Sequence, residues 1–451
     1  MKLQMTEGKI FPQLIRFSIP LILSSVLQLL FNAADLVVVS RFSSENAMGA
    51  VGATSSLINL LVNLFLGLSV GCNVVAANFT GARQKEGVVK TVHTAIPLSV
   101  ISGLVLTLTG LAFTRQILEI MGTPENILPL SALYLKIYFG GITATVVYNF
   151  GAAILRAKGD TRRPLYILLT AGVINVILNV VFVLSFEKEN AVAGVALATV
   201  ISQLFSAACV IFLLIHEEDE FRLILRKIKI CKPVLLRILK IGVPAGLQSA
   251  IFSLSNIVIQ SAVNEFGEVY VDGNSACQSV EGFIYTSMNS VAQSSLTFTG
   301  QNMGAHNFDR IKKGVRTCLL SVTVIGLVMG NLAVIFGEEI LGIYSSSPQI
   351  IAAARERLLV IGASYFTCGI MDVIANSIRG MGYSFLPMIV TLLGACGLRL
   401  IYLFTVFRTD AVYSYQNIFL SYPLSWVVTF TILMCTFISV LKKNILFSEK
   451  N

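Results

Sequence analysis

Four ionisable residues lie well inside long apolar segments of this 451-residue chain. They are Asp35, Glu281, Asp372 and Arg399. A charged side chain is expensive in hydrocarbon, so such residues usually mark an ion or substrate pathway, or pair with an opposite charge. They are therefore the first candidates for the chemistry of this protein.

Asp35 belongs to a polar face of the apolar segment that begins near Ile10. Gln28, Asn32 and Asp35 are spaced at i, i+4 and i+7, which places them on one side of a helix. Pro20 removes a backbone hydrogen bond about four turns earlier and predicts a bend in that helix.

Amides and a hydroxyl of two later segments are expected to lie near Asp35. Asn175 and Asn179 are i, i+4 partners, and Thr199 follows in the next segment. A carboxylate in such surroundings is costly to ionise, which suits a proton carrier, while the same oxygens also suit a monovalent cation. Each Asn or Thr alone is equally explained by helix-packing hydrogen bonds. The predicted coupling-ion site consists of Asp35, Asn175, Asn179 and Thr199.

The second half of the chain carries a long polar stripe at helical spacing. Its members are Gln278, Glu281, Tyr285, Asn289 and Gln293, with Ser249, Ser253, Asn256 and Gln260 on the preceding segment. Such stripes face water or another polar helix, not lipid. The residues predicted to line a substrate cavity are Gln28, Asn32, Asn256, Glu281, Tyr285 and Asp372.

Two pairings are expected among the charged residues of the second half. Glu281 and Arg399 lie at a similar depth in their segments, which predicts a buried and mainly structural ion pair. Asp372 is followed at i+7 by Arg379. It is either a second titrating site or only a partner of that arginine.

The sequence offers no constellation for catalysis or for a metal centre. The three histidines lie far apart, and the eight cysteines show no metal-ligand spacing. No phosphate-binding loop or nucleophile elbow is present, so ATP is excluded as the energy source. We predict a protein that is not an enzyme, without a cofactor, in which H⁺ or Na⁺ serves as coupling ion and Asp35 is where a monovalent cation would bind.

Composition places the chain in a membrane. Only 13% of residues are charged, 55% are hydrophobic, and the mean hydropathy is +0.79. Twelve apolar segments are long enough to cross the bilayer. They span approximately residues 12–39, 47–79, 91–113, 131–156, 164–186, 191–215, 234–263, 273–303, 315–337, 352–379, 386–407 and 413–441. The predicted fold is an all-α membrane protein with twelve transmembrane helices.

Charge in the connections predicts orientation. Most of the 33 basic residues fall in the termini and in alternate connections, which places both termini in the cytoplasm of a plasma (inner) membrane protein. The net charge of +9 is thus accounted for by the bilayer and gives no reason to expect a nucleic-acid partner. We expect a monomer whose partners are a small-molecule substrate and the lipid bilayer.

The second half of the sequence repeats motifs of the first half. The stretch Leu155–Pro164 recurs about 223 positions later as Ile378–Pro387, and Thr80–Arg83 and Pro20 recur at nearly the same offset. Two homologous six-helix lobes are expected at residues 1–215 and 234–451, related by a pseudo-two-fold axis along the membrane normal. The basic cytoplasmic linker at 216–233 contains residues 221–230, which predict either an amphipathic helix on the inner leaflet or a plain connector.

These features resemble the multidrug and toxic compound extrusion (MATE) family of secondary antiporters over essentially the whole chain. The most specific stretches are 155–164, the Asn-Ala-Ala-Asp segment ending at Asp35, 191–199 and 300–305. The resemblance implies two six-helix lobes around a central cavity and export of cationic or amphipathic organic compounds by alternating access, in exchange for H⁺ or Na⁺. It also implies that the residues matching the family's functional positions are Asp35, Pro20, Asn175 and Thr199.

Three departures from the family pattern put the coupling ion in question. Asn179 stands where many prokaryotic members carry a second Asp, and the seventh segment offers Ser253 and Asn256 where sodium-driven members carry Glu. Asp372 lies about one turn from the usual acid of the tenth segment. The alternative is a flippase or an exporter of a lipid-linked or peptide-like metabolite on the same two-lobe architecture.

Overall fold

A computed structural model describes residues 4–42, 45–185, 191–409 and 412–450. Its helices are α1 (Ile10–Phe42), α2 (Glu45–Gly81), α3 (Lys85–Ile120), α4 (Leu128–Ala157), α5 (Arg162–Ser185), α6 (Ala191–Ile215), α7 (Lys232–Asn264), α8 (Glu268–Gly304), α9 (Phe308–Ile335), α10 (Gly337–Gly342), α11 (Pro348–Ser364), α12 (Phe366–Gly380), α13 (Phe385–Thr391), α14 (Leu398–Phe404), α15 (Tyr415–Ile418) and α16 (Ser421–Lys450). A 3₁₀ turn, Leu225–Lys227, and a π turn, Leu392–Gly397, complete the secondary structure of these residues.

The predicted all-α membrane fold is confirmed. Ten helical stretches of the described chain are long and apolar enough to cross a bilayer, and α11 with α12 forms another that bends by 49°. α8 is 37 residues long, but its polar stripe makes it much less apolar than the others. With α8 counted, the described residues contain the twelve membrane-length segments expected from the sequence. The predicted end of the fifth segment, residue 186, lies outside the described residues.

The described chain forms two compact units. The first contains Leu23–Thr80 and Gln84–Gly246, and the second contains Gln4–Ile22, Gly81–Arg83 and the chain from Leu247 onward. Two of the helices that contribute to both units change unit just after an internal proline. α1 does so after Pro20, and α7 does so after Pro244. Both helices continue through their prolines, and the bend expected at Pro20 stays a prediction.

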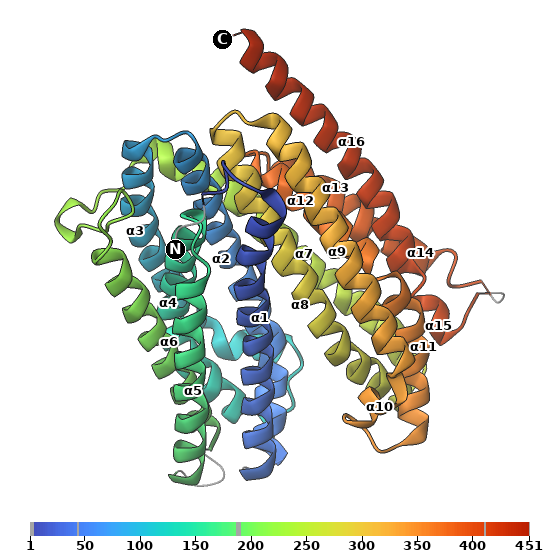
Figure 1. The fold of residues 1–451 in the computed structure, drawn as a ribbon. Coiled ribbons are helices and arrows are strands. Elements are labelled where there is room, and N and C mark those ends of the chain that lie inside the picture. Colours follow the sequence, from blue (N-terminus) through green and yellow to red (C-terminus); the bar gives the residue numbers. More distant parts are fainter. Residues whose placement is uncertain (1–3, 43–44, 186–190, 410–411, 451) are drawn as a thin grey trace. The chain divides into compact units, whose positions relative to one another are not determined.

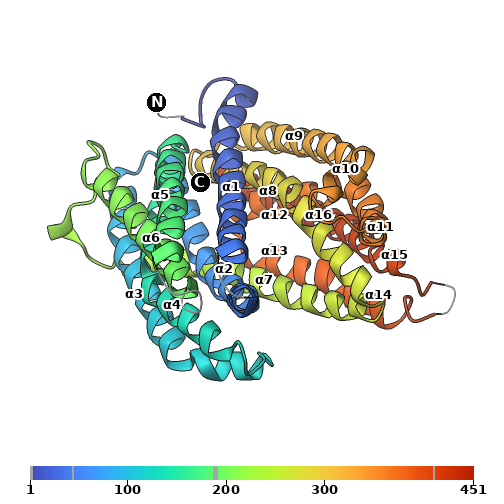
Figure 2. The same ribbon diagram turned by 90° about the horizontal axis from the view of Figure 1, so that it is seen from below.

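In the first unit, α4 packs between α3 and α6, and α5 packs on α6 (Figures 1 and 2). Small residues bring these helices close together. A Cβ atom on Gly141 of α4 would lie only 2.5 Å from the side chain of Val200 on α6. Membrane helices associate through such close packing because lipid provides little hydrophobic driving force between them.

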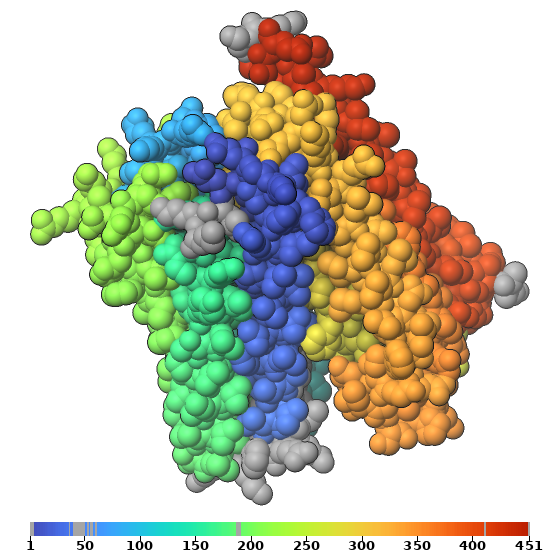
Figure 3. All heavy atoms as spheres, in the orientation of Figure 1, coloured from blue at the N-terminus to red at the C-terminus, as the bar shows by residue number. Residues whose placement is uncertain are grey.

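In the second unit, α8 packs against α9, α11 and α12, and α12 also contacts α16. The C-terminal end of α16 projects beyond the neighbouring helices of its own unit (Figures 1 and 3). The central position of α8 explains how a helix with so many polar residues is tolerated, because many of them, such as Glu281, Ser287 and Ser294, are buried against protein.

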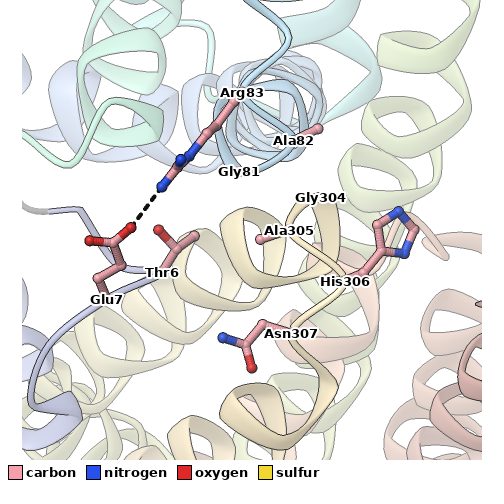
Figure 4. A pocket seen from close by; sticks show the side chains of 9 residues that line it. All are labelled: Thr6, Glu7, Gly81, Ala82, Arg83, Gly304, Ala305, His306 and Asn307. Carbon is pink, nitrogen blue, oxygen red and sulfur yellow. Dashed lines mark hydrogen bonds and ion pairs between the residues drawn. The ribbon is translucent and has the colours of Figure 1, made fainter.

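Backbone geometry repeats in the two halves, as the duplicated sequence predicts. Arg83 and His306 have positive φ values of 55° and 53°, and Gly159 and Gly382 have 95° and 94°. Because few non-glycine residues adopt positive φ, the matched pair Arg83 and His306 marks the same turn built twice. Together with the N-terminal segment, both turns line a cavity of about 390 Å³, where Glu7 pairs with Arg83 at 2.7 Å (Figure 4).

The linker between α6 and α7 is a connector, and the expected amphipathic helix at 221–230 is wrong. Only Leu225–Lys227 forms a 3₁₀ turn, and Phe221 and Leu223 are buried. Side chains of α3 accept backbone N–H groups of this segment: His93 Nε2 accepts from Ile224 at 3.1 Å. Tertiary contacts therefore satisfy the backbone groups that an isolated amphipathic segment would satisfy by forming a helix.

Acidic residues at the start of the linker are held by the repeated motif of the first half. Lys158, whose side chain is 2% exposed, pairs with Asp219 at 2.7 Å and also with Glu217. Arg163 contacts Glu217 at 2.6 Å. This buried cluster fixes the linker on the end of α4 and α5.

Candidate functional site

The first unit brings together the four residues predicted to form the coupling-ion site. Asn179 Nδ2 donates to Asp35 Oδ1 and lies 3.3 Å from Asn175 Oδ1. Asn175 Nδ2 in turn lies 3.4 Å from Thr199 Oγ1. The i, i+4 spacing on α5 sets both amides on one face, and α1 and α6 supply the carboxylate and the hydroxyl.

This cluster of polar side chains is largely shielded from solvent, and the charge of Asp35 is not neutralised. Asn179 is 0% exposed and Asn175 6%. Among the described residues, no basic side chain forms an ion pair with Asp35. A carboxylate without a counter-charge in such a place favours binding of a proton or a cation.

One acceptor of the cluster is left over. Within the described part of the chain, the buried Oδ1 of Asn179 has no hydrogen-bond donor. Buried amide oxygens are rarely left without a partner. Carboxylate, amide and hydroxyl oxygens are also the ligands that hard cations prefer, so the arrangement can hold either a proton on Asp35 or a small cation near it.

The two other polar residues of the α1 face are not part of this cluster. Gln28 and Asn32 are exposed on α1, and none of the described contacts joins either of them to Asp35. Their predicted role in a substrate cavity stays a prediction.

The expected Glu281–Arg399 pair is wrong, because Glu281 pairs with Arg357 of α11. Arg357 Nε and Nη2 contact the two carboxylate oxygens of Glu281 at 2.7 and 2.6 Å. Arg399 instead donates from Nε to Ser425 Oγ at 3.0 Å and lies 4.1 Å from the ring centroid of Tyr422. The depth of a residue along a helix does not determine which way its side chain points. Glu281 of α8 points toward Arg357 of α11.

Sequence reasoning did not single out Arg357 as a buried residue. The available signal was its position inside the apolar run 352–379, followed directly by Leu358. The pair is deeply buried, with side-chain exposures of 4% for Arg357 and 6% for Glu281. A third contact, from Arg357 Nη1 to Asn274 Oδ1 at 2.6 Å, completes the bonding of the guanidinium.

Asp372 lies in a separate cluster of the second unit. Its carboxylate hydrogen-bonds with the side chains of Asn289 and Tyr285, and Asn289 Nδ2 lies 3.3 Å from Tyr285 Oη. The structure does not pair Asp372 directly with Arg379 among the described ion pairs. Arg379 donates to Asn376 and Gln248 instead.

Three of the predicted cavity residues line one cavity of the second unit. Asn256, Glu281 and Tyr285 lie around a space of about 250 Å³, together with Arg357. Gln28, Asn32 and Asp372 do not line it. Polar groups of α7 and α8 thus meet as the stripe predicted, around a space large enough for a small molecule.

The MatE family model matches the chain twice, at residues 20–181 and 244–405, once in each half. The chain belongs to the multidrug and toxic compound extrusion (MATE) family. It is therefore a multi-span membrane protein of a transporter family, and the resemblance drawn from its motifs is confirmed.

Known relatives and solved structures agree with this assignment. The chain is 27% identical over 434 residues to the probable multidrug resistance protein YoeA of Bacillus subtilis, covering 95% of this chain and 93% of YoeA. It is 28% identical over 394 residues to the probable multidrug resistance protein YpnP of the same organism, covering 87% and 88%.

The crystal structure of MATE in complex with MaL6 has a TM-score of 0.89 to this structure. That alignment covers 98% of this chain and 99% of the other, at 22% identity. At this identity the likeness supports the fold, and it agrees with the two-lobe arrangement of twelve helices.

Proposed function

We propose that this MATE family member exports organic cations or amphipathic drugs and metabolites by alternating access, in exchange for H⁺ or Na⁺. We further propose that it acts as a monomer in the plasma membrane with both termini in the cytoplasm. The observation that carries the proposal is the chain of contacts from Asp35 through Asn179 and Asn175 to Thr199. The names of YoeA and YpnP, probable multidrug resistance proteins, support the same substrate class.

Coupling follows from the uncompensated charge of Asp35. Binding of a proton or a cation removes the cost of the buried carboxylate and stabilises the conformation in which the cluster is closed. An organic cation that favours the other conformation is then released when the ion binds. Such reciprocal effects are required by thermodynamic linkage between the two sites.

The test is exchange in proteoliposomes with imposed gradients. Ethidium efflux is measured under a pH gradient or a sodium gradient, which identifies the coupling ion. In Asp35→Asn, the amide oxygen can still accept from Asn179, so the fold should survive while the charge is lost. We expect gradient-driven efflux to fall to the level of protein-free liposomes.

The matched control is Asp272→Asn, an exposed acid near the start of α8. It should exchange at the wild-type rate. Membrane content and thermal unfolding of Asp35→Asn are measured alongside, so that loss of transport is separated from loss of fold. Full ion-driven efflux by folded Asp35→Asn would refute the proposed coupling site.

A further inference from the structure

The cavity of about 250 Å³ in the second unit has chemistry that the Asp35 cluster lacks. Its walls come from α7, α8, the C-terminal end of α11, and α16. The lining residues that matter for a ligand are Asn256, Gln278, Gly282, Tyr285, Tyr365 and Tyr422. Drug-sized ligands usually occupy pockets of about 300 Å³ or more, so this space suits a smaller molecule or one ring system of a larger one.

The charge on the cavity wall is balanced. Glu281 and Arg357 are the charged residues among those that line it, and they neutralise one another through two short contacts. Arg357 is held further by Asn274 and lies 4.8 Å from the ring centroid of Phe419. A ligand with a net charge would find no free counter-ion here, and burial of such a charge is costly. The wall therefore favours an uncharged molecule.

Aromatic rings provide flat surfaces on the cavity wall. Tyr285 stacks on Tyr365 with ring centroids 6.5 Å apart and an interplanar angle of 27°. Tyr365 stacks in turn on Trp426 at 5.5 Å and 29°, and Tyr422 packs against Trp426 at 5.4 Å. Tyr285, Tyr365 and Tyr422 all line the cavity, so its wall includes aromatic side chains, which suits a planar ring.

Two amides in the cavity are available for hydrogen bonds. Asn256 and Gln278 are exposed, and among the described residues no hydrogen bond involves the side-chain amide of either. Each amide offers both donors and an acceptor, so together they can match a ring that carries neighbouring N–H and C=O groups.

The space reaches the backbone of α8 at Gly282. A Cβ atom built on this glycine would meet no other atom within 4 Å. Most other glycines inside the helices of this unit lie against neighbouring backbone or side chains. The open space at Gly282 offers a way to fill the cavity without displacing any neighbour.

We propose that this cavity is a substrate subsite for an uncharged planar ring bearing amide-type donors and acceptors. This inference rests on the proposed function in one respect, that the ligand is treated as transported cargo. Binding itself is measured at equilibrium without an ion gradient. The proposal assigns the second unit a selectivity opposite to that of the Asp35 cluster, which attracts cations.

The single tryptophan of the chain, Trp426, supplies the readout. Its ring stacks on Tyr365 and packs edge-to-face against Tyr422, both on the cavity wall, so its fluorescence reports a ring system bound there. The probe is lumichrome, an uncharged tricyclic molecule with amide groups, and proflavine is a planar cation of comparable size. Purified protein is titrated with each, and free tryptophan amide corrects for light absorption by the probe.

We expect saturable quenching by lumichrome and not by proflavine. Gly282→Leu should weaken lumichrome binding by at least about ten-fold, since leucine occupies the space and is also a better helix former than glycine. The matched control is Gly140→Leu on α4, a helical glycine that also has nothing within 4 Å and is exposed, which should bind as wild type. Gln278→Leu, which leaves the cavity open but removes an amide, should weaken binding several-fold if Gly282→Leu does not fold.

Three outcomes would overturn the subsite: quenching by lumichrome that does not saturate, equal affinity in Gly282→Leu and wild type, or tighter binding of proflavine. A failure of ion-driven transport by the wild-type protein, with intact lumichrome binding, would count against the proposed function and leave the subsite standing. The reverse result would count against the subsite alone.

Discussion

Asp35 of the first unit and Glu281 of the second are both largely shielded from solvent, but their charges are treated in opposite ways. In the first unit, Asp35 contacts the neutral amide of Asn179, and no described basic side chain pairs with it. In the second unit, Glu281 receives two hydrogen bonds from Arg357. A buried acid that already has a counter-ion is structural, while one without a counter-ion must obtain a proton or a cation from outside.

The duplicated motif shows a second contrast. Lys158 in the first copy is buried and holds Glu217 and Asp219 of the linker. The matching position in the second copy is Met381, which is buried without any charge. The turn at Gly159 and at Gly382 has the same backbone geometry in both copies. Only the first copy, which lies next to the linker, carries a lysine that pairs with the linker's acidic residues.

The largest expected effect comes from breaking the neutralised pair. Arg357→Met leaves Glu281 as an unpaired buried charge, and we expect the free energy of unfolding to fall by about 3–5 kcal/mol. Asp35→Asn should change it by less than about 1 kcal/mol, because the hydrogen bond from Asn179 is retained. Thermal and denaturant unfolding in detergent measure both variants.

A double variant sharpens this test. Glu281→Leu combined with Arg357→Met removes both charges and should recover most of the stability lost in the single variant, as replaced buried ion pairs often do. If Arg357→Met is no less stable than Asp35→Asn, the distinction between a structural and a functional acid is wrong.

A smaller effect is expected at the linker. Lys158→Met copies the second repeat and leaves the buried Glu217 and the half-buried Asp219 without their ammonium group. We expect a loss of about 1–3 kcal/mol. Lys312→Met removes an exposed lysine whose Asp309 partner is 84% exposed, and should change stability by less than about 0.5 kcal/mol. Equal unfolding temperatures for the two lysine variants would contradict a role of Lys158 in holding the linker.

The smallest effect on stability is expected for an arginine–glutamate pair at the surface. Arg408 contacts Glu265 at 2.7 Å, and this hydrogen bond holds the pKa of Glu265 below its usual value. A lowered pKa means that the stabilisation is present at neutral pH and is lost as the pH falls through the folded-state pKa. Because both side chains are partly exposed, we expect less than about 1 kcal/mol.

The measurement compares Glu265→Gln with wild type at pH 7 and at about pH 3. The difference in unfolding temperature should be small at pH 7 and smaller still at the lower pH. A difference that grows on acidification would reverse the assigned sign. A difference as large as that of Arg357→Met would show that burial does not separate the two arginine–carboxylate pairs.

Much of the architecture was predictable from local properties of the chain. Hydropathy runs predicted the membrane-length helices, and the repeated motif at 155–164 and 378–387 indicated the duplication. Both properties can be predicted because span length and repeat spacing depend only on the order of residues along the chain. The Asp35 cluster was also predictable: α5 sets Asn175 and Asn179 one turn apart, so a single helix face carries both.

Other features required the packed structure. Hydropathy and depth could not choose between Arg357 and Arg399 as the partner of Glu281, since the choice depends on how α8 and α11 are rotated about their axes. The linker segment 221–230 had a helical pattern, yet it forms only a 3₁₀ turn and instead contacts His93 and Lys158. Those contacts join residues far apart in the sequence.

The amino-acid sequence by itself determined that this is a duplicated, twelve-helix membrane protein with an acid in its first helix, because each of those properties depends on composition and periodicity. Only the tertiary structure decided which buried acid is neutralised and where a cavity opens. The physical reason is that the energy of a buried charge depends on the few side chains within hydrogen-bond reach, and helix packing selects those.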